Sequence, residues 1–370
     1  MTQRQTLPFQ HVTIIGVGLI GGSLALAIKH RFPDIQITGV DKPHVLKRAL
    51  QRNAIDKAER SVKRAVHTAD LIIVASPVSS IAKLLPVIAR NSAAHAIVTD
   101  TGSVKQAIVE QAQKLFPHGN FIGGHPMTGS EFSGIDAAHE LLFQNAIYLL
   151  TPTRVTKKQS LRLLTKFFGS LDARIFTIKP SKHDSIIAAV SHLPQLAAVA
   201  LMNTVGKDHP DAPNHLALAA GGFRDMTRIA SSKFEIWNDI LSANQKEIGK
   251  ALQLYIRQLK KLANVANFNP SHLAADFRIS RKLRSRIPLS MKGFSSQLAD
   301  LAVFVDDKPG QLARLTSALA KKKVNIKDME LLKVREGRGG TFRLSFENRN
   351  VAVEAARILQ KAGFDVSGKP

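Results

Sequence analysis

The residue with the clearest chemical potential is His125, in the segment GGHPMTGSE at positions 123–131. A neutral imidazole, with a reference pKa near 6.5, can accept a proton from a hydroxyl group at physiological pH. Two glycines precede His125 and Pro126 follows it, so the backbone is constrained. Because removal of a hydroxyl proton helps a hydride leave the same carbon, we predict that His125 is a catalytic base in a loop.

A glycine-rich turn supplies the second chemical signal. Residues 12–23, VTIIGVGLIGGS, read as a buried strand, a G-x-G-x-x-G turn and the start of a helix. Gly16 permits the tight turn, Gly18 lets a pyrophosphate approach the backbone, and Gly21 lets helix and strand pack closely. The free N–H groups and dipole of the helix N-terminus then favour phosphates.

An acidic residue at the end of the next strand indicates which dinucleotide binds. The strand Ile35–Val40 ends in Asp41, at the spacing where a carboxylate accepts hydrogen bonds from the adenosine ribose. A carboxylate repels a 2′-phosphate, so NAD is favoured over NADP. The adjacent Lys42 tempers this preference slightly.

Three further polar loops follow apolar runs, namely residues 75–77, 99–105 and 123–131. In a parallel sheet, loops at the carboxyl ends of the strands converge on one crevice. The residues expected to contact the cofactor are Gly16, Gly18, Leu19, Ile20, Gly21, Asp41, Ser76, Pro77 and Thr101.

Arg228, in GGFRDMTRIA, is the candidate anchor for an acidic substrate, because a guanidinium binds a carboxylate through two hydrogen bonds. The alternative is a surface arginine paired with Asp225. His192 precedes Pro194, which must bend an otherwise apolar helix. His192 is equally well explained as a core histidine bonded to a backbone carbonyl.

The chain is long enough for several domains. We expect a Rossmann-type, doubly wound parallel α/β sheet over residues 10–151, an all-helical domain over 152–277, a basic linker over 278–297 and a C-terminal domain over 298–370. The last segment reads as strand, helix, strand, strand, helix, strand, which is a βαββαβ ferredoxin-like unit.

Composition narrows the class of protein. The formal charge of +24 is spread through every segment, which favours a general attraction for anions over a nucleic-acid site. Cysteine is absent, the first ten residues are polar, and residues 186–202 are interrupted by polar groups and proline. We therefore expect a cytoplasmic protein with a buried apolar helix, no membrane span, no nucleic-acid partner and no metal.

Several motifs together carry a family resemblance. GVGLIGGS, the ASPV turn, TDTGSVK, GGHPMTGSE, SHLPQ, GGFRDMTRIASS and Trp237 resemble the prephenate dehydrogenase family, which includes arogenate and cyclohexadienyl dehydrogenases. From residue 298 onward the chain resembles an ACT domain. The resemblance implies NAD-dependent oxidative decarboxylation of prephenate to 4-hydroxyphenylpyruvate in tyrosine biosynthesis, and a homodimer formed through the helical domain.

The resemblance also implies roles for individual residues. His125 contacts the ring hydroxyl, Ser103 lies near that hydroxyl and the nicotinamide, and Arg228 holds a substrate carboxylate. The other residues expected at the substrate are Arg224, His192, Gln195, Ser130 and Glu131. The ACT resemblance implies tyrosine as an effector, bound near Asp306, Gly310, Asn325 and Ile326.

One departure from the family pattern leaves the substrate open. Many relatives that use prephenate have S-H-x-P-H where this chain has Ser191-His192-Leu193-Pro194-Gln195. Gln195 carries no charge, so arogenate remains an alternative to prephenate. Two other classes of protein are also open. One is an NAD enzyme of the hydroxyacid or 6-phosphogluconate type, which the GGHPMTGSE loop fits poorly. The other is an amino-acid-sensing regulator, which the intact glycines, Asp41 and His125 argue against.

Overall fold

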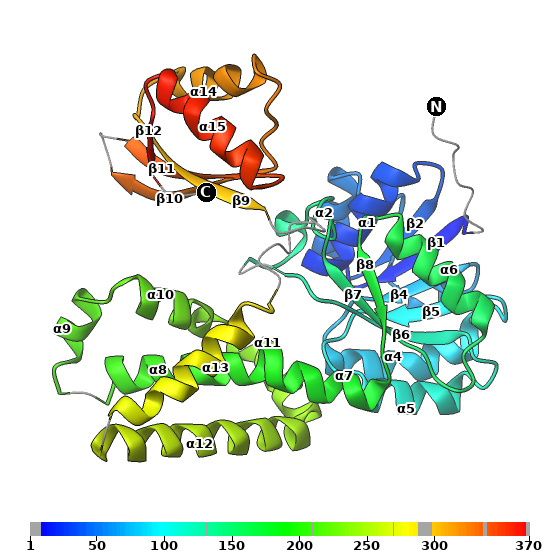
Figure 1. Ribbon diagram of the computed structural model, residues 1–370. Coiled ribbons are helices and arrows are strands. Elements are labelled where there is room, and N and C mark those ends of the chain that lie inside the picture. Colours follow the sequence, from blue (N-terminus) through cyan, green and yellow to red (C-terminus); the bar gives the residue numbers. More distant parts are fainter. Residues whose placement is uncertain are drawn as a thin grey trace. The chain divides into compact units, whose positions relative to one another are not determined.

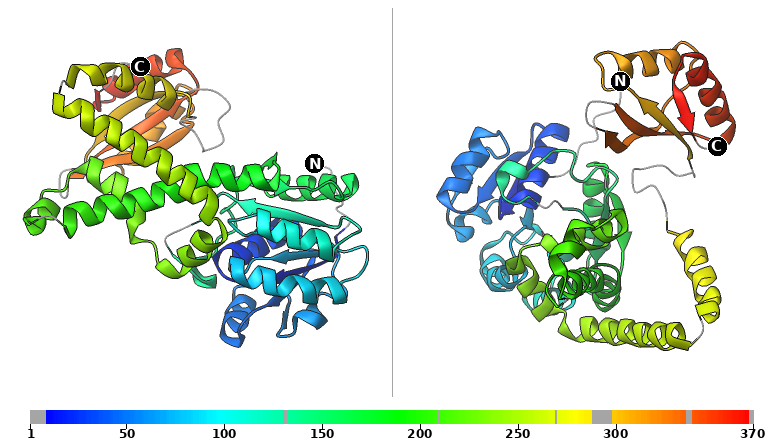
Figure 2. Two further views of the ribbon diagram at one scale, coloured as in Figure 1. Left: turned by 90° about the horizontal axis from the view of Figure 1, so that it is seen from below. Right: turned by 90° about the vertical axis from the view of Figure 1, so that its left-hand side faces the viewer.

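The computed structural model describes residues 9–129, 132–208, 210–268, 270–287, 298–335 and 339–367. Two compact units divide the chain, residues 1–275 and residues 276–370 (Figures 1 and 2). The first unit contains the glycine-rich turn and His125, so it holds the candidate site.

Among the described residues, the first unit is built on an eight-stranded sheet in the order β3-β2-β1-β4-β5-β6-β7-β8. The strands are β1 (His11–Ile15), β2 (Gln36–Val40), β3 (Lys57–Glu59), β4 (Leu71–Val74), β5 (Ile97–Asp100), β6 (Phe121–Pro126), β7 (Ile147–Thr151) and β8 (Arg174–Thr177). Strands β1 to β6 are parallel, which confirms the Rossmann-type core. Beyond this core, β7 pairs antiparallel with β6, and β8 runs parallel to β7.

Helices cover both faces of this sheet (Figure 1). They are α1 (Leu19–Arg31), α2 (Pro43–Gln51), α3 (Val62–Ala65), α4 (Val78–Asn91), α5 (Gln106–Leu115) and α6 (Lys158–Gly169), with the short 3-10 turn η1 (Ile135–Ala137) after β6. Apolar residues of α1, α2 and α6 form one buried cluster and those of α3, α4 and α5 form the other. The central strands of the sheet are therefore buried on both faces, as their apolar residues predict.

His125 lies within β6 and not in a loop, which corrects the prediction. The two glycines before it mark close approach between backbones. A Cβ on Gly123 would lie 2.3 Å from the Thr151 hydroxyl oxygen, and one on Gly124 would lie 2.5 Å from the Asp100 carbonyl oxygen. Glycine in a strand often has this meaning, and here it allows His125 to be held in a buried strand between β5 and β7.

The remainder of the first unit is helical. Its elements are α7 (Pro180–Ile187), the π-helical segment η2 (Ala188–His192), α8 (Leu193–Gly206), α9 (Ala212–Ala217), α10 (Gly221–Thr227), the 3-10 turn η3 (Arg228–Ser231), α11 (Phe234–Ala243), α12 (Gln245–Phe268) and the 3-10 turn η4 (Pro270–Leu273). Residues of η2, α8, α11 and α12 share a small apolar cluster. These helices bring polar side chains toward the carboxyl ends of the sheet strands.

The proline expected to bend the helix follows a π turn. Pro194 has no N–H group, so the carbonyl of Val190 cannot receive the usual α-helical hydrogen bond from it. The N–H of Leu193 bonds to the carbonyl of Ala188, five residues back, and η2 widens the helix just before the proline. Turns of this type often occur at functional sites.

The continuous helix Pro180–Gly206 is long and apolar enough to cross a membrane by length and composition, which is weak evidence for a span. Only 28% of its most apolar window is buried within the chain. The expectation of a buried helix is therefore met only in part, since one face, including Val190, is open to solvent in a single chain.

Helix α13 (Ala274–Arg284) spans the boundary between the two units, so part of the expected basic linker 278–297 is helical because it is rich in good helix formers. The sheet that follows has the order β10-β11-β9-β12 and is antiparallel. Its elements are β9 (Ala299–Val305), α14 (Gln311–Ala320), β10 (Asp328–Arg335), β11 (Gly339–Phe346), α15 (Arg349–Lys361) and β12 (Asp365–Ser367). The predicted ferredoxin-like unit is thus confirmed, with both helices packed on one apolar cluster.

Candidate active site

A cavity of about 730 Å³ lies at the carboxyl ends of β1, β2 and β4. Five of the expected cofactor residues line it: Gly16, Gly18, Asp41, Ser76 and Pro77. Three basic side chains also line it, those of Lys42, Arg60 and Lys83. One carboxylate among three cations makes this cavity suited to an anionic ligand.

The glycines of the turn fit a dinucleotide. Gly16 has φ of +91°, and a Cβ there would lie 2.4 Å from the Ala75 carbonyl oxygen, so only glycine suits the position. A Cβ on Gly18 would meet no atom within 4 Å, which leaves open space over the backbone for a pyrophosphate. Gly21 packs α1 against the turn, because a Cβ there would lie 1.9 Å from the Gly16 carbonyl oxygen. Leu19 and Ile20 form the first residues of α1.

Asp41 has a structural contact in addition to its expected ligand. One carboxylate oxygen accepts a hydrogen bond from the Val17 N–H and the other from the Lys42 N–H, each at 2.7 Å. The carboxylate therefore fixes the glycine turn relative to β2. Its oxygens also have further lone pairs that can accept ribose hydroxyls.

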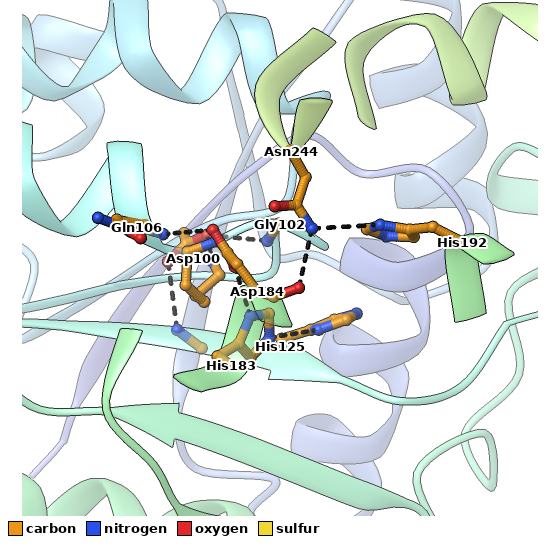
Figure 3. Close-up of polar contacts among 10 residues, drawn as sticks. Asp100, Gly102, Gln106, His125, His183, Asp184, His192 and Asn244 are labelled. Carbon is orange, nitrogen blue, oxygen red and sulfur yellow. Dashed lines mark hydrogen bonds and ion pairs between the residues drawn. The ribbon is translucent and has the colours of Figure 1, made fainter. Parts of the chain in front are cut away.

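His125 contacts a second buried histidine (Figure 3). Its Nδ1 lies 2.8 Å from Nε2 of His183, which is on α7. The other ring nitrogen of His183, Nδ1, lies 2.7 Å from a carboxylate oxygen of Asp184. Three side chains thus form one hydrogen-bonded chain from Asp184 through His183 to His125.

The chemistry of these groups assigns the ring protons. A carboxylate only accepts hydrogen bonds, so Nδ1 of His183 donates to Asp184. When His183 is neutral its Nε2 is then bare and accepts, and Nδ1 of His125 must donate to it. Neutral His125 therefore has its lone pair on Nε2, which can accept a proton.

The Asp184 carboxylate is held by the N-terminus of α5, a helix of the sheet domain. Its carboxylate accepts hydrogen bonds from the backbone N–H groups of Lys105 and Gln106, at 2.8 and 2.9 Å. These groups lie at the N-terminus of α5, where negative charge is stabilised. The contact joins α7 to the sheet domain and fixes the position of His183.

A buried ion pair lies beside this series of hydrogen-bonded side chains. Lys105 and Asp100 are fully buried, and the Lys105 ammonium is paired with the Asp100 carboxylate. Asp100 also accepts hydrogen bonds from the N–H groups of Gly102 and Gly124. Burial lowers the pKa of Lys105, and the Asp100 carboxylate opposes that effect.

Burial also keeps the histidines neutral. It lowers the pKa of His125 well below its usual value, and the neighbouring His183, Lys105 and His192 add to the effect. Burial lowers the pKa of His183 as well, but there the hydrogen bond to Asp184 opposes it. At neutral pH both rings are therefore uncharged and His125 can accept a proton.

His192 lies at the end of η2 and is almost completely buried. The Asn244 side-chain N–H₂ group donates to the Asp184 backbone carbonyl at 2.9 Å and lies 3.3 Å from Nδ1 of His192. Nδ1 of His192 is then the acceptor, so its Nε2 carries the proton. That Nε2 has no hydrogen-bond partner among the described residues, which leaves a buried donor available to a ligand.

Arg228 and Arg224 lie on η3 and the preceding α10, and both side chains are exposed. Gln195, expected at the substrate, is buried and donates a hydrogen bond from its amide nitrogen to the Ile229 carbonyl. Gln195 therefore connects α8 to the turn that carries Arg228.

The other expected residues are less informative. Ser103 is half-buried in the connection between β5 and α5, and the N–H of Thr101 donates to the Val74 carbonyl. Ser130 and Glu131 lie outside the described residues. Among the residues that the structure describes, no group of three or more His, Cys, Asp or Glu side chains could hold a metal ion.

The expected effector residues are not brought together within one chain. Asp306 and Gly310 follow the end of β9, and Gly310 begins α14 with φ of +85°. Asn325 and Ile326 precede β10. The first residue of β10 pairs with a residue of β11 that in turn pairs with a residue at the start of β9. The two pairs therefore lie at opposite ends of the sheet.

Sequence reasoning missed His183, Asp184, Asn244, Asp100 and Lys105. The available signals were weak, namely adjacent His and Asp in SKHDS and an acid and a base five positions apart in DTGSVK. Each residue acts through a partner that is distant in the sequence or through burial.

Comparison with known proteins identifies the domains. Residues 24–177 match the model of the prephenate dehydrogenase nucleotide-binding domain, 179–276 that of the prephenate dehydrogenase dimerization domain, and 299–364 that of the ACT domain. The prephenate dehydrogenase of Bacillus subtilis is 36% identical over 94% of this chain and 95% of its own length.

Two solved structures are also similar. Arogenate dehydrogenase from Synechocystis is 33% identical with a TM-score of 0.66, and covers 74% of this chain and 99% of its own. Prephenate dehydrogenase from A. aeolicus, in complex with hydroxyphenyl propionate and NAD+, is 29% identical with a TM-score of 0.70, and covers 76% of this chain and 99% of its own. The chain belongs to the prephenate dehydrogenase family, with a C-terminal ACT domain.

Proposed function

We propose that this enzyme catalyses the NAD-dependent oxidative decarboxylation of prephenate to 4-hydroxyphenylpyruvate. The observation that carries the proposal is the contact between His125 and His183, which leaves Nε2 of His125 as a proton acceptor. The reaction needs such an acceptor for the ring hydroxyl. It needs no metal and no covalent nucleophile, because aromatisation of the ring drives loss of carbon dioxide.

The cofactor of this enzyme is NAD, in keeping with the nucleotide-binding domain and the similar structure that contains NAD+. When bound, NAD accepts the hydride from the ring carbon that bears the hydroxyl. Gly16, Gly18, Asp41 and the Ser76-Pro77 segment would hold it, since all of them line the cavity. Thr101, Leu19 and Ile20 are proposed to contact it from the adjoining loop and helix.

The substrate is bound by groups of the helical segment. We assign Arg228, aided by Arg224, to the substrate carboxylates, because exposed guanidiniums attract and bind anions. His192 offers its Nε2–H to a substrate oxygen. Ser103 is assigned a contact near the ring hydroxyl, and Ser130 and Glu131 are assigned to the rim of the site.

Arogenate is the second candidate substrate, and Gln195 favours it. A neutral amide beside the Arg228 turn cannot supply the extra charge that a histidine offers. Similarity to the Synechocystis arogenate dehydrogenase supports the same alternative.

We further propose a homodimer formed through residues 179–276, which match a dimerization domain and expose an apolar helix face. Tyrosine is the proposed effector of the ACT domain. Because Asp306 and Asn325 lie at opposite ends of one sheet, a site that uses both requires two chains.

The test is an assay of the purified protein with prephenate or arogenate, each with NAD or NADP, followed by the absorbance of the reduced nicotinamide. Turnover of prephenate with NAD supports the proposal. Turnover of arogenate alone transfers the assignment to the second candidate, and turnover of neither substrate removes both. Addition of tyrosine to the same assay tests the effector.

A further inference from the structure

His183 is a buried titratable group that the proposed reaction does not yet use. Its ring is completely buried and bonded at both nitrogens, to His125 on one side and to Asp184 on the other. A residue needed only to fill space would not require two ring nitrogens in line with a carboxylate. The arrangement has the geometry of a path for a proton.

We infer that His183 is a positioning residue that also receives the Nδ1 proton of His125 when His125 Nε2 takes the substrate's hydroxyl proton. This inference rests on the proposed function, because it concerns the same base. It adds a second proton transfer to the reaction and assigns Asp184 as the counter-charge.

The charged groups around the two rings favour this direction of transfer. His183 faces Asp184 and Asp100 on the favourable side and Lys105 on the unfavourable side. His125 faces Lys105, His183 and His192, with no carboxylate among the groups that shift its pKa. A positive charge is therefore better stabilised on His183 than on His125, since of the two rings only that of His183 is hydrogen-bonded to the Asp184 carboxylate.

The proton balance of the reaction is consistent with His183 holding one proton temporarily. Oxidation of the ring alcohol releases one proton from oxygen and one hydride from carbon. Decarboxylation then returns the electron pair of the broken carbon–carbon bond to the ring, which forms a phenolate that must regain a proton. The proton held as N–H on His183 can return through His125 to that oxygen, so no net proton leaves the site.

Two substitutions of His183 distinguish its role in orienting His125 from its role in carrying a proton. In His183→Gln, the amide oxygen can still accept the hydrogen bond from His125, but the amide cannot take up a proton. In His183→Leu, both functions are lost while most of the side-chain volume remains. His118→Gln is the matched control, because His118 is exposed and lies before β6, at the amino end of that strand.

Kinetics with the substrate found in the assay give the first readout. If His183 carries the proton, His183→Gln lowers kcat by about 10² to 10⁴, the usual range for a lost acid–base group, and changes KM by less than about threefold. The dependence of kcat on the deuterium fraction of the solvent changes from curved in the wild type to linear in the variant. If His183→Gln keeps a kcat within about threefold of the wild type and only His183→Leu is impaired, the proton-carrying function is excluded.

NMR of the histidine ring nitrogens gives a readout that needs no activity. In the full-length wild type, His125 should carry its proton on Nδ1, and on acidification His183 should be the first of the two rings to hold protons on both nitrogens. A proton on Nε2 of neutral His125, or charging of His125 before His183, would overturn the inference. Since this experiment uses no substrate, it remains decisive even if the enzyme turns over neither prephenate nor arogenate.

Discussion

The amide nitrogen of Gln195 lies 2.9 Å from the carbonyl oxygen of Ile229, so α8 is tied directly to the turn that begins at Arg228. The bonded atoms belong to residues 34 positions apart in the sequence. Gln195 thus orients the proposed anion-binding turn.

Gln195→Ala should loosen this turn. The lost hydrogen bond lowers the free energy of unfolding by about 1 kcal/mol, and more if the Ile229 carbonyl stays buried without a partner. KM for the acidic substrate should rise while the Kd of NAD stays constant. Urea unfolding and steady-state kinetics measure the two effects, with the exposed Gln113→Ala as control. An unchanged KM would show that the turn is held without Gln195.

Arg228→Ala should weaken substrate binding directly. Hydrogen bonds to charged groups contribute about 1.5–3 kcal/mol, so KM should rise by about tenfold to a hundredfold. Arg228→Lys should restore part of the affinity, because lysine keeps the charge but loses the planar pair of donors. Arg162→Ala, at an exposed position on α6, is the charge-matched control. Equal KM values in all three variants would rule out Arg228 as the anchor.

His125→Asn should abolish the proton acceptor and leave the cofactor cavity intact. We expect kcat to fall by about 10² to 10⁴. NAD should bind as in the wild type, because His125 is not among the residues that line the cavity. Titration with NAD and single-turnover kinetics separate the two quantities, and His118→Asn serves as control. A kcat close to that of the wild type would remove His125 from the reaction.

Two glycine substitutions in the same turn should change different properties: Gly18→Ala the affinity for NAD, and Gly16→Ala the stability of the fold. Gly18→Ala meets open space, so its melting temperature should match the wild type while its Kd for NAD rises by at least about tenfold. Gly16→Ala should lower the free energy of unfolding by about 1–3 kcal/mol, because alanine is strained at a φ of +91° and meets the Ala75 carbonyl. Thermal unfolding and NAD titration provide both measurements. A cofactor affinity unchanged in Gly18→Ala would place the pyrophosphate elsewhere.

Acidification should destabilise the fold through its buried histidines. Burial lowers the pKa of His192 to about 4 from 6.5, so the unfolded chain binds more protons between these two values. The free energy of unfolding should therefore fall as pH decreases from about 6.5 toward about 4, and His125 and His183 act in the same direction. Urea unfolding across this range measures the slope, which His192→Gln should reduce and His118→Gln should not. A slope that His192→Gln leaves unchanged would contradict this assignment.

The sequence predicted the local features of the fold correctly. Gly16, Gly18 and Asp41 follow from strand, turn and helix signals within about thirty residues, and the βαββαβ unit follows from alternating apolar patterns. The network behind His125 could not be predicted in this way. His125 and His183 are 58 residues apart, and Asn244 and Asp184 are 60 apart, with no periodic pattern that links them.

The misplaced elements have the same cause. The glycines beside His125 indicate a loop when taken alone, because local sequence does not reveal that Asp100 and Thr151 pack closely against the strand there. The reversed direction of β7 likewise depends on pairing with β6 and not on its own residues.

The wide turn at Ala188–His192 adds one residue to a helix that carries polar groups on both sides of it. A π turn closes its hydrogen bond over five residues where an α-helix uses four, so the extra residue is taken up within the turn itself. Deleting a single alanine from Ala188–His192 should therefore convert this turn to a regular α turn, in which the proline ring would clash with the carbonyl four residues before it. The added width of one backbone turn thus lets an unbroken helix accommodate Pro194.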